Sequence, residues 1–460
     1  LTLLVIVISL LCGIVALYWQ LWLIFGIIIY ITFVIYFSKG FKNPLNIHVV
    51  ALSSLILHAT PSTILILLGE IPIDKDQFLT LFATISIGLM GYILGALFFK
   101  RLVSFEKGGG FQLSKKLNFL FWLSYKYRFV LAIICTLILF NEGFLPMGLS
   151  YQESVKYRME TPGVIKYYNS LINQVFSILT IAMISIIGDI HKRGKLSLLS
   201  YLLIGLVVCS IIGGHRGWIL SIFCCLMLTF QSFLKRRHIL LIIILAPIVM
   251  LILSGGIRYA RAGGSFTRNI QNFSEYLTNI VDVDFINLLR TSSDFEGPFS
   301  TYITLIENVP HNMKYDYTLP IKDMALLIPT IIYPERPLPV NQWYVKTFKP
   351  DIYERGGGLT FYVIGFGYLF AGIIGSFICL FLYGVLFEIF RKFFILVGGP
   401  AAMFLYSCYF ISLFAFARGM GIIVYVKNII MNIVVPISLL FIFTLALNTI
   451  FKYYFKHKKV

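Results

Sequence analysis

The residues with the clearest chemical potential lie in a short turn between two apolar runs. This turn, GGHRGW at residues 213–218, places His215 and Arg216 between glycines. A guanidinium group suits bidentate contact with phosphate, and glycine lets a ligand approach the backbone closely. The alternative is an interfacial arginine that reaches lipid head groups, with Trp218 in the aromatic belt. A charged residue is unusual in so short a turn between two apolar runs. We therefore favour phosphate binding by Arg216, with His215 beside it.

A second cationic group follows the apolar run that ends near residue 256. Arg258 and Arg261 share one face if the helix continues, and Arg268 comes shortly after them. Such a patch suits a diphosphate anion held at the membrane surface. Anchoring to anionic lipid explains each arginine about equally well, and we expect at least one of them to bind substrate.

Three further side chains are candidate general bases for a hydroxyl group. Asp294 and Glu296 lie two residues apart, and His311 follows them. Carboxylates and imidazoles accept protons in general base catalysis. For each one, a solvated polar residue that caps a short helix is the more ordinary interpretation.

One charge lies inside an apolar run. Lys427, followed by Asn428 and Asn432, is expected to face the helix bundle or a cavity, as intramembrane charges do. A structural hydrogen bond or a charge pair is the favoured role.

The amino-acid composition indicates which class of protein carries these candidate side chains. Hydrophobic residues make up 58% of the 460 residues and charged residues 13%, far from the balance of a soluble domain. The chain is therefore predicted to be an all-α integral membrane protein. Its net charge of +18 is attributed to basic loops at one membrane face, and no nucleic-acid motif accompanies it. The seven cysteines lie in apolar runs, so neither a disulfide nor a metal site is expected.

Hydropathy predicts about twelve spanning helices. The first run lacks the flanks of a signal peptide and is expected to be retained as a span. Lysine and arginine gather in alternate loops, which places both termini in the cytoplasm. The runs are residues 1–18, 20–37, 46–69, 77–99, 128–147, 169–188, 196–214, 217–234, 239–256, 359–390, 393–416 and 419–447.

The spans predict three parts: a nine-span bundle over 1–256, an extracytoplasmic lid loop with short helices over 257–358, and three spans with a basic cytoplasmic tail over 359–460. The loop holds more than half of the chain's 20 acidic residues. A long loop of this kind is usually functional. Its apolar segment 324–334 is too short to span and is predicted to be re-entrant or to lie at the interface. No internal repeat is evident, and this asymmetry counts against a transporter.

Four stretches of the C-terminal half follow the GHRG turn at 214–217 in a fixed order. They are YDYT at 315–318, ALLIPTIIYPERP at 325–337, GGGLT at 356–360 and GYLFAGIIG at 367–375. In this order and spacing they resemble the Wzy-type bacterial polymerases of O-antigen and capsule repeat units, and residues 214–217 are similar to that family's Gly-Ser-Arg-Gly turn, with His215 in place of serine. The resemblance covers about residues 210–380, and the family's frequent glutamate before the last stretch is Phe366 here.

The resemblance implies a fold related to the multispanning, lipid-dependent (GT-C-like) glycosyltransferases. It implies transfer of undecaprenyl-diphosphate-linked oligosaccharide chains onto lipid-linked repeat units at the outer face of the bacterial plasma membrane, without metal or cofactor. A chain-length regulator and a flippase are candidate protein partners, beside the membrane lipids. By motif the substrate-binding residues would include Arg216, Arg336 and Tyr368, while Arg258, Arg261 and Arg355 follow from charge and position.

Two other functions stay open. An O-antigen ligase has the same fold and would attach finished chains to another acceptor. Loss of a polymerase would leave single repeat units, whereas loss of a ligase would leave long unattached chains. A lipid-linked oligosaccharide flippase would carry charge along a central path, and central runs such as 393–416 carry almost none.

Overall fold

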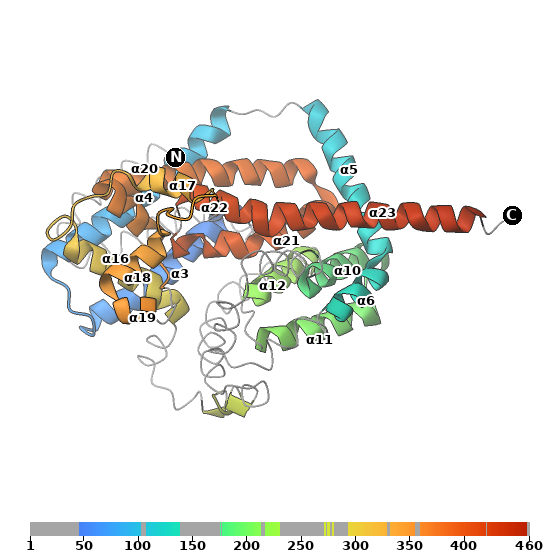
Figure 1. The fold of residues 1–460 in the computed structure, drawn as a ribbon, viewed down its shortest axis with the longest axis horizontal. Helices are drawn as coiled ribbons and strands as arrows, with labels where there is room; N and C mark the ends of the chain where they lie inside the picture. The colour runs from blue at the N-terminus through green and yellow to red at the C-terminus, as the bar shows by residue number, and fades with distance from the viewer. Residues whose placement is uncertain are drawn as a thin grey trace.

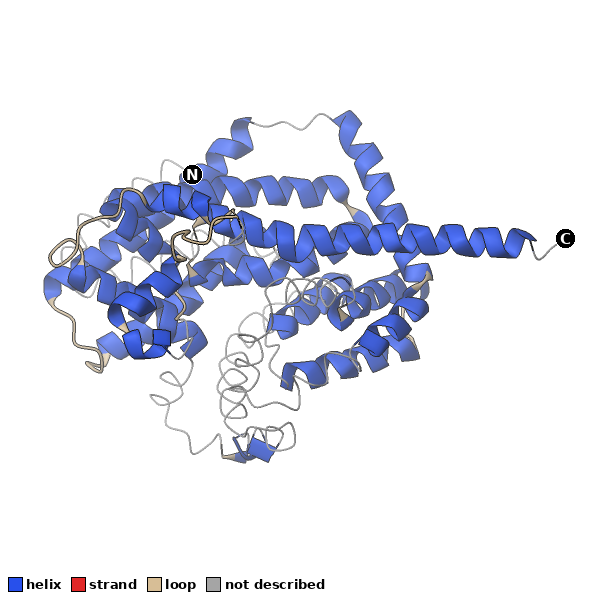
Figure 2. Cartoon of the chain, in the orientation of Figure 1, coloured by secondary structure: helices blue, strands red, loops and turns tan. Residues whose placement is uncertain are grey.

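The computed structural model describes residues 46–102, 107–138, 175, 177–212, 217–230, 271–272, 274–276, 278–279, 293–328, 332–354, 359–419 and 421–457. Within these ranges every regular element is a helix and no strand occurs (Figure 2). The predicted all-α class is therefore confirmed for this part of the chain. The predicted domain boundaries near residues 256 and 358 lie outside the described residues.

Four helices are long and apolar enough to cross a membrane: Asp76–Arg101, Val363–Val397, Gly399–Arg418 and Ile422–Tyr454. They coincide with the predicted runs 77–99, 359–390, 393–416 and 419–447. A fifth candidate is the pair Gln112–Lys126 and Arg128–Leu137, bent by 65°. The described residues thus show a helical membrane protein with four to five candidate spans, and the remaining spans and the orientation stay predictions.

The other predicted runs have different outcomes. Runs 1–18, 20–37 and 239–256 lie outside the described residues. Runs 46–69, 169–188, 196–214 and 217–234 contain helices that are not among these candidates, and their crossing of the membrane stays a prediction. These helices are α3 (Ile47–Leu67), α10 (Ile178–Arg193), α11 (Leu198–Ile212) and α12 (Gly217–Phe230). The segment 100–128, expected to be a loop, is largely helix α5 (Lys107–Lys126), because only its first half is polar. Helix α6 (Arg128–Ile138) follows it.

The helices of the predicted large loop gather at one end of the molecule, where the last span begins (Figure 1). They are short, as predicted for this loop, apart from the first. Their bounds are α16 (Ser293–Asn308), α17 (Leu319–Ala325), α18 (Val340–Phe348) and α19 (Pro350–Glu354). Helix α16 packs on α3, and its buried Phe299 and Tyr302 join the core with α3 and α20.

Helices α4 (Lys75–Leu102) and α20 (Val363–Val397) form the most extensive helix pair. Glycines allow their backbones to touch: a Cβ on Gly95 would lie 2.0 Å from the Phe381 carbonyl oxygen, and one on Gly384 would lie 2.1 Å from that of Tyr92. Small residues at such interfaces are typical of membrane helices. Residue numbers rise together along both helices, so the two helices are parallel, in agreement with their predicted common direction.

Helix α20 is broken near its start. Ala371 and Gly372 have non-helical dihedral angles, and Gly372 has φ 62°. The chain folds back there, since Ser376 Oγ donates to the Ile364 carbonyl oxygen at 2.9 Å. The GYLFAGIIG stretch is therefore a reversal between two helical segments, in which Gly375 lies against the backbone of Gly367.

The last span contains a π-helical segment. It runs from α22 (Ile422–Ile429) through the π turn Ile430–Val434 into α23 (Val435–His457). Pro436 has no N–H to continue the α-helical hydrogen bonds, which accounts for the altered pattern just before it. Such π segments occur frequently at functional sites.

Candidate functional site at the start of the last span

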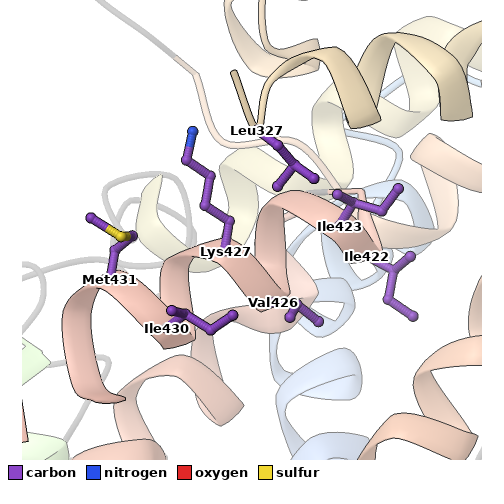
Figure 3. A pocket seen from close by; sticks show the side chains of 7 residues that line it. All are labelled: Leu327, Ile422, Ile423, Val426, Lys427, Ile430 and Met431. Atoms are coloured by element: carbon purple, nitrogen blue, oxygen red, sulfur yellow. The ribbon is translucent and has the colours of Figure 1, made fainter. Parts of the chain in front are cut away.

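An apolar groove of about 350 Å³ lies along α22. Its walls are hydrophobic side chains, and one lysine, Lys427, lies among them. Figure 3 shows this lysine extending from α22 toward the segment that carries Leu327. The lining residues are Leu327, Ile422, Ile423, Val426, Lys427, Ile430 and Met431. The groove thus combines an apolar surface with one positive group.

A second cation meets Lys427 at the edge of this groove. Lys427 Nζ donates to the Leu326 carbonyl oxygen at 2.5 Å, and Arg336 Nη1 lies 3.5 Å from the same oxygen. Arg336 also donates to the carbonyl oxygen of Ile328 at 3.0 Å. Among the described residues neither cation forms an ion pair with a carboxylate. Two adjacent, unneutralised cations beside an apolar surface favour an anion with an apolar tail.

Asp323 attaches the loop helix α17 to the start of α22. Its carboxylate accepts a hydrogen bond from the Ile423 N–H at 3.1 Å. Gly421 leaves room for that carboxylate, because a Cβ there would lie 2.0 Å from an Asp323 oxygen. Burial raises the pKa of Asp323 to about 6, against the opposing effect of the backbone donors. This contact places the segment that carries Leu326 and Leu327 over the groove.

The predicted interface-lying segment 324–334 is described up to residue 328 and again from 332. Helix α17 ends at Ala325, and turns follow it. Large apolar side chains of this region are exposed, among them Ile321, Met324 and Ile332. Exposed apolar groups beside a spanning helix fit a position in the bilayer interface, which stays a prediction.

Sequence reasoning missed two charged residues of this region, Asp323 and Arg418. Arg418 precedes Gly419 in the turn between α21 (Gly399–Ala415) and α22, and its Nε donates to His58 Nε2 at 3.4 Å. Arg216 was singled out because it is a charged residue in a short turn with glycines. The same argument applies to Arg418 and would have identified it. Asp323 has no such signal in the sequence.

Tyr368, predicted to bind substrate, is buried in the turn at the start of α20. Its hydroxyl donates to the Val309 carbonyl oxygen at 3.0 Å, and its ring packs against Tyr302 and Tyr315. These contacts hold α16 and the YDYT stretch against α20. Contact with substrate stays a prediction.

The three candidate bases are not brought together. Asp294 and Glu296 lie in the first turn of α16, whereas His311 is exposed three residues beyond its end. About 18 Å of helix separate Glu296 from Asn308. A single site can therefore take its base either from Asp294 and Glu296 or from His311, but not from both ends of α16.

Five predicted substrate-binding residues lie outside the described residues: His215, Arg216, Arg258, Arg261 and Arg355. Of the arginines predicted to bind substrate, Arg336 lies within the described residues, and it lies at the edge of the groove. No group of three or more metal-ligating side chains occurs in the described part of the chain.

The chain matches no protein-family model, no curated protein and no solved structure. The resemblance to the repeat-unit polymerases therefore stays a prediction, and the site must be interpreted from its own geometry.

Proposed function

We propose that this protein is a membrane glycosyltransferase that polymerises oligosaccharide repeat units carried on undecaprenyl diphosphate. The observation that carries the proposal is the α22 groove, with Lys427 and Arg336 at its edge. A polyprenyl diphosphate has an apolar chain and a doubly charged head group. Its first isoprene units match the isoleucine walls, and its diphosphate matches the two cations.

In the proposed reaction, a hydroxyl oxygen of the acceptor repeat unit attacks the anomeric carbon of the donor chain. The bond from that carbon to the diphosphate oxygen breaks, and the diphosphate leaves with the electron pair. The hydroxyl proton passes to a base, for which Asp294, Glu296 and His311 are the candidates. Positive groups held in place before the reaction stabilise the departing charge, and Arg216, Arg258, Arg261 and Arg355 are proposed to assist Lys427 and Arg336.

The protein is proposed to act in the bacterial plasma membrane with this site on the extracytoplasmic face. The large loop supplies Arg336 and the carbonyl groups that hold both cations.

Reconstitution with a synthetic polyprenyl-diphosphate repeat unit tests the proposal. The wild-type protein should yield a ladder of products on a gel. Lys427→Ala and Arg336→Ala should each lower the rate of chain extension by about 10²-fold or more, the effect of removing one group that stabilises transition-state charge. Lys349→Ala, which removes an exposed cation beyond α18, should leave the ladder unchanged. Equal ladders from all four proteins would refute the assigned site.

A further inference from the structure

A second cationic site lies far from the groove, at the bend between α5 and α6. Tyr125 is the centre of this site. Its ring fills the space above Gly188 of α10, where a Cβ would lie 2.0 Å from the ring. Its hydroxyl donates to Asp189 Oδ1 at 2.7 Å. The end of α10 is thereby fixed against the bend.

Two cations share the Tyr125 ring. Arg128 Cζ lies 3.9 Å from the ring centroid and Lys192 Nζ lies 5.2 Å from it. Lys192 also lies 5.0 Å from the Trp122 ring centroid. Arg193 follows in the last turn of α10. A cation over an aromatic face is attracted by the ring, which helps to hold it in place.

The one nearby carboxylate balances only one of these cations. Asp189 already accepts hydrogen bonds from Tyr125, from the Ser197 N–H at 2.8 Å and from the Ser200 hydroxyl at 2.6 Å. It also forms an ion pair with Arg128, whose Nη2 lies 3.4 Å from Oδ1. Among the described residues no ion pair joins Lys192 or Arg193 to a carboxylate. Arg128 also donates from Nη1 to the Tyr125 carbonyl oxygen at 3.2 Å, so its guanidinium is held in the fold. The cluster keeps a net positive charge, and an external anion is expected at its exposed members, Lys192 and Arg193.

An apolar stripe begins beside Arg128. Phe129, Ile133 and Leu137 are exposed at spacings of four residues on one face of α6. Residues four apart share a helix face, so this stripe can lie along an acyl chain. Leu198 and Leu202 of α11, which packs on α10, are also exposed.

We propose that the Arg128–Lys192–Arg193 cluster binds the phosphate of an anionic phospholipid, whose acyl chain lies along the Phe129–Ile133–Leu137 stripe. Basic groups between helices at a membrane face are suited to anionic lipid head groups. This lipid is separate from the glycan carrier, and it would fix the α5–α6 bend against α10.

Binding of phosphatidylglycerol and phosphatidylcholine to the purified full-length protein tests the proposal, measured by native mass spectrometry and by thermal unfolding. The wild-type protein should prefer phosphatidylglycerol. Lys192→Gln with Arg193→Gln should weaken phosphatidylglycerol binding about 25-fold, about fivefold for each cation. Both side chains are exposed, so this variant should fold even if Arg128→Gln does not. The matched control, Lys346→Gln with Lys349→Gln, should keep the wild-type preference.

Three results would overturn the proposal. One is an unchanged preference for phosphatidylglycerol in the Lys192/Arg193 double variant. Another is an equal loss in the Lys346/Lys349 control, which would indicate non-specific attraction. The third is full protection of the wild-type protein by inorganic phosphate alone, which would assign the site to a free anion.

Discussion

Asp323 shows how one buried carboxylate joins the outer loop to the membrane helices. It is 5% exposed and receives the Ile423 N–H at the start of the last span. Two effects oppose each other here, because a helix N-terminus favours the charged form while burial disfavours it. Burial dominates, and the pKa rises from 3.8 to about 6.

This raised pKa predicts a pH dependence of stability. Between about pH 4 and pH 6 the folded protein holds a proton that the unfolded chain has lost, so the free energy of unfolding falls as the pH rises. The loss is complete above about pH 6 and amounts to at most about 3 kcal/mol. Asp323→Asn keeps an oxygen acceptor and cannot titrate. The difference in unfolding midpoint between wild-type protein and Asp323→Asn, measured from pH 4 to 7, should therefore grow in favour of the variant as the pH rises; a difference that is constant with pH would contradict the assignment.

At the residue scale, sequence reasoning singled out the charge that lies inside an apolar run, Lys427, but missed Arg418 in its short turn. Lys427 was expected to face the bundle or a cavity and to make a structural hydrogen bond, and it lines the groove and donates to Leu326. That Arg336 lies beside it could not be predicted, because the two residues are 91 positions apart in the sequence and only the fold brings them to one carbonyl oxygen. Asp323 looked like an ordinary loop carboxylate for the same reason.

Among the elements, α4 and α20 have the closest contact. Gly95 and Gly384 have no room for a side chain, since the nearest backbone oxygens would lie 2.0 Å and 2.1 Å from an added Cβ. Gly205 in α11 has open space instead. These three positions give a matched comparison between contact glycines and an unconstrained one.

We expect Gly95→Leu and Gly384→Leu to separate α4 from α20 and to destabilise the protein strongly, as overpacking of at least about 1–3 kcal/mol does in a dense interior. Gly205→Ala should instead leave stability equal or raise it by up to about 1 kcal/mol through helix propensity. Size-exclusion profiles and unfolding midpoints in detergent check both statements. Folded, wild-type-like behaviour of the two leucine variants would mean that the helices do not pack as described.

Helix α20 shows that hydropathy predicts the presence of a long apolar helix but not a break within it. Its residues were predicted to span as 359–390, and a long apolar helix is present. The reversal at Ala371 and Gly372 was not predicted, because the residues before and after it are equally apolar. The bend at Tyr127 was not predicted either. The first half of α5 is polar, so the whole segment before Arg128 was predicted to be a loop, although its second half is apolar.

On the scale of the whole molecule, the two ends of the bundle differ in charge and chemistry. One end holds α16 to α19 and the α22 groove. At the other, Lys392 Nζ donates to the Phe99 carbonyl oxygen at 3.2 Å, and Arg391 forms an ion pair with Glu388 through Nε at 2.6 Å. The parallel packing of α4 and α20 brings Lys100, Arg101, Arg391 and Lys392 to this same end. The positive-inside rule assigns such a basic end to the cytoplasm, and this orientation stays a prediction.

This asymmetry predicts opposite chemical accessibility for two exposed lysines. Lys349, between α18 and α19, lies at the groove end, and Lys195, just after α10, lies beside the cluster at the α5–α6 bend. In spheroplasts a membrane-impermeant maleimide should label Lys349→Cys at once and should label Lys195→Cys only after permeabilisation. Wild-type protein is the background control for the native cysteines, of which Cys135, Cys224, Cys225 and Cys379 are buried and Cys408 is partly buried. The reverse labelling pattern would place the groove in the cytoplasm, where an outer-face glycan polymerase cannot work, and would therefore exclude the proposed function while leaving the lipid-binding proposal testable on its own.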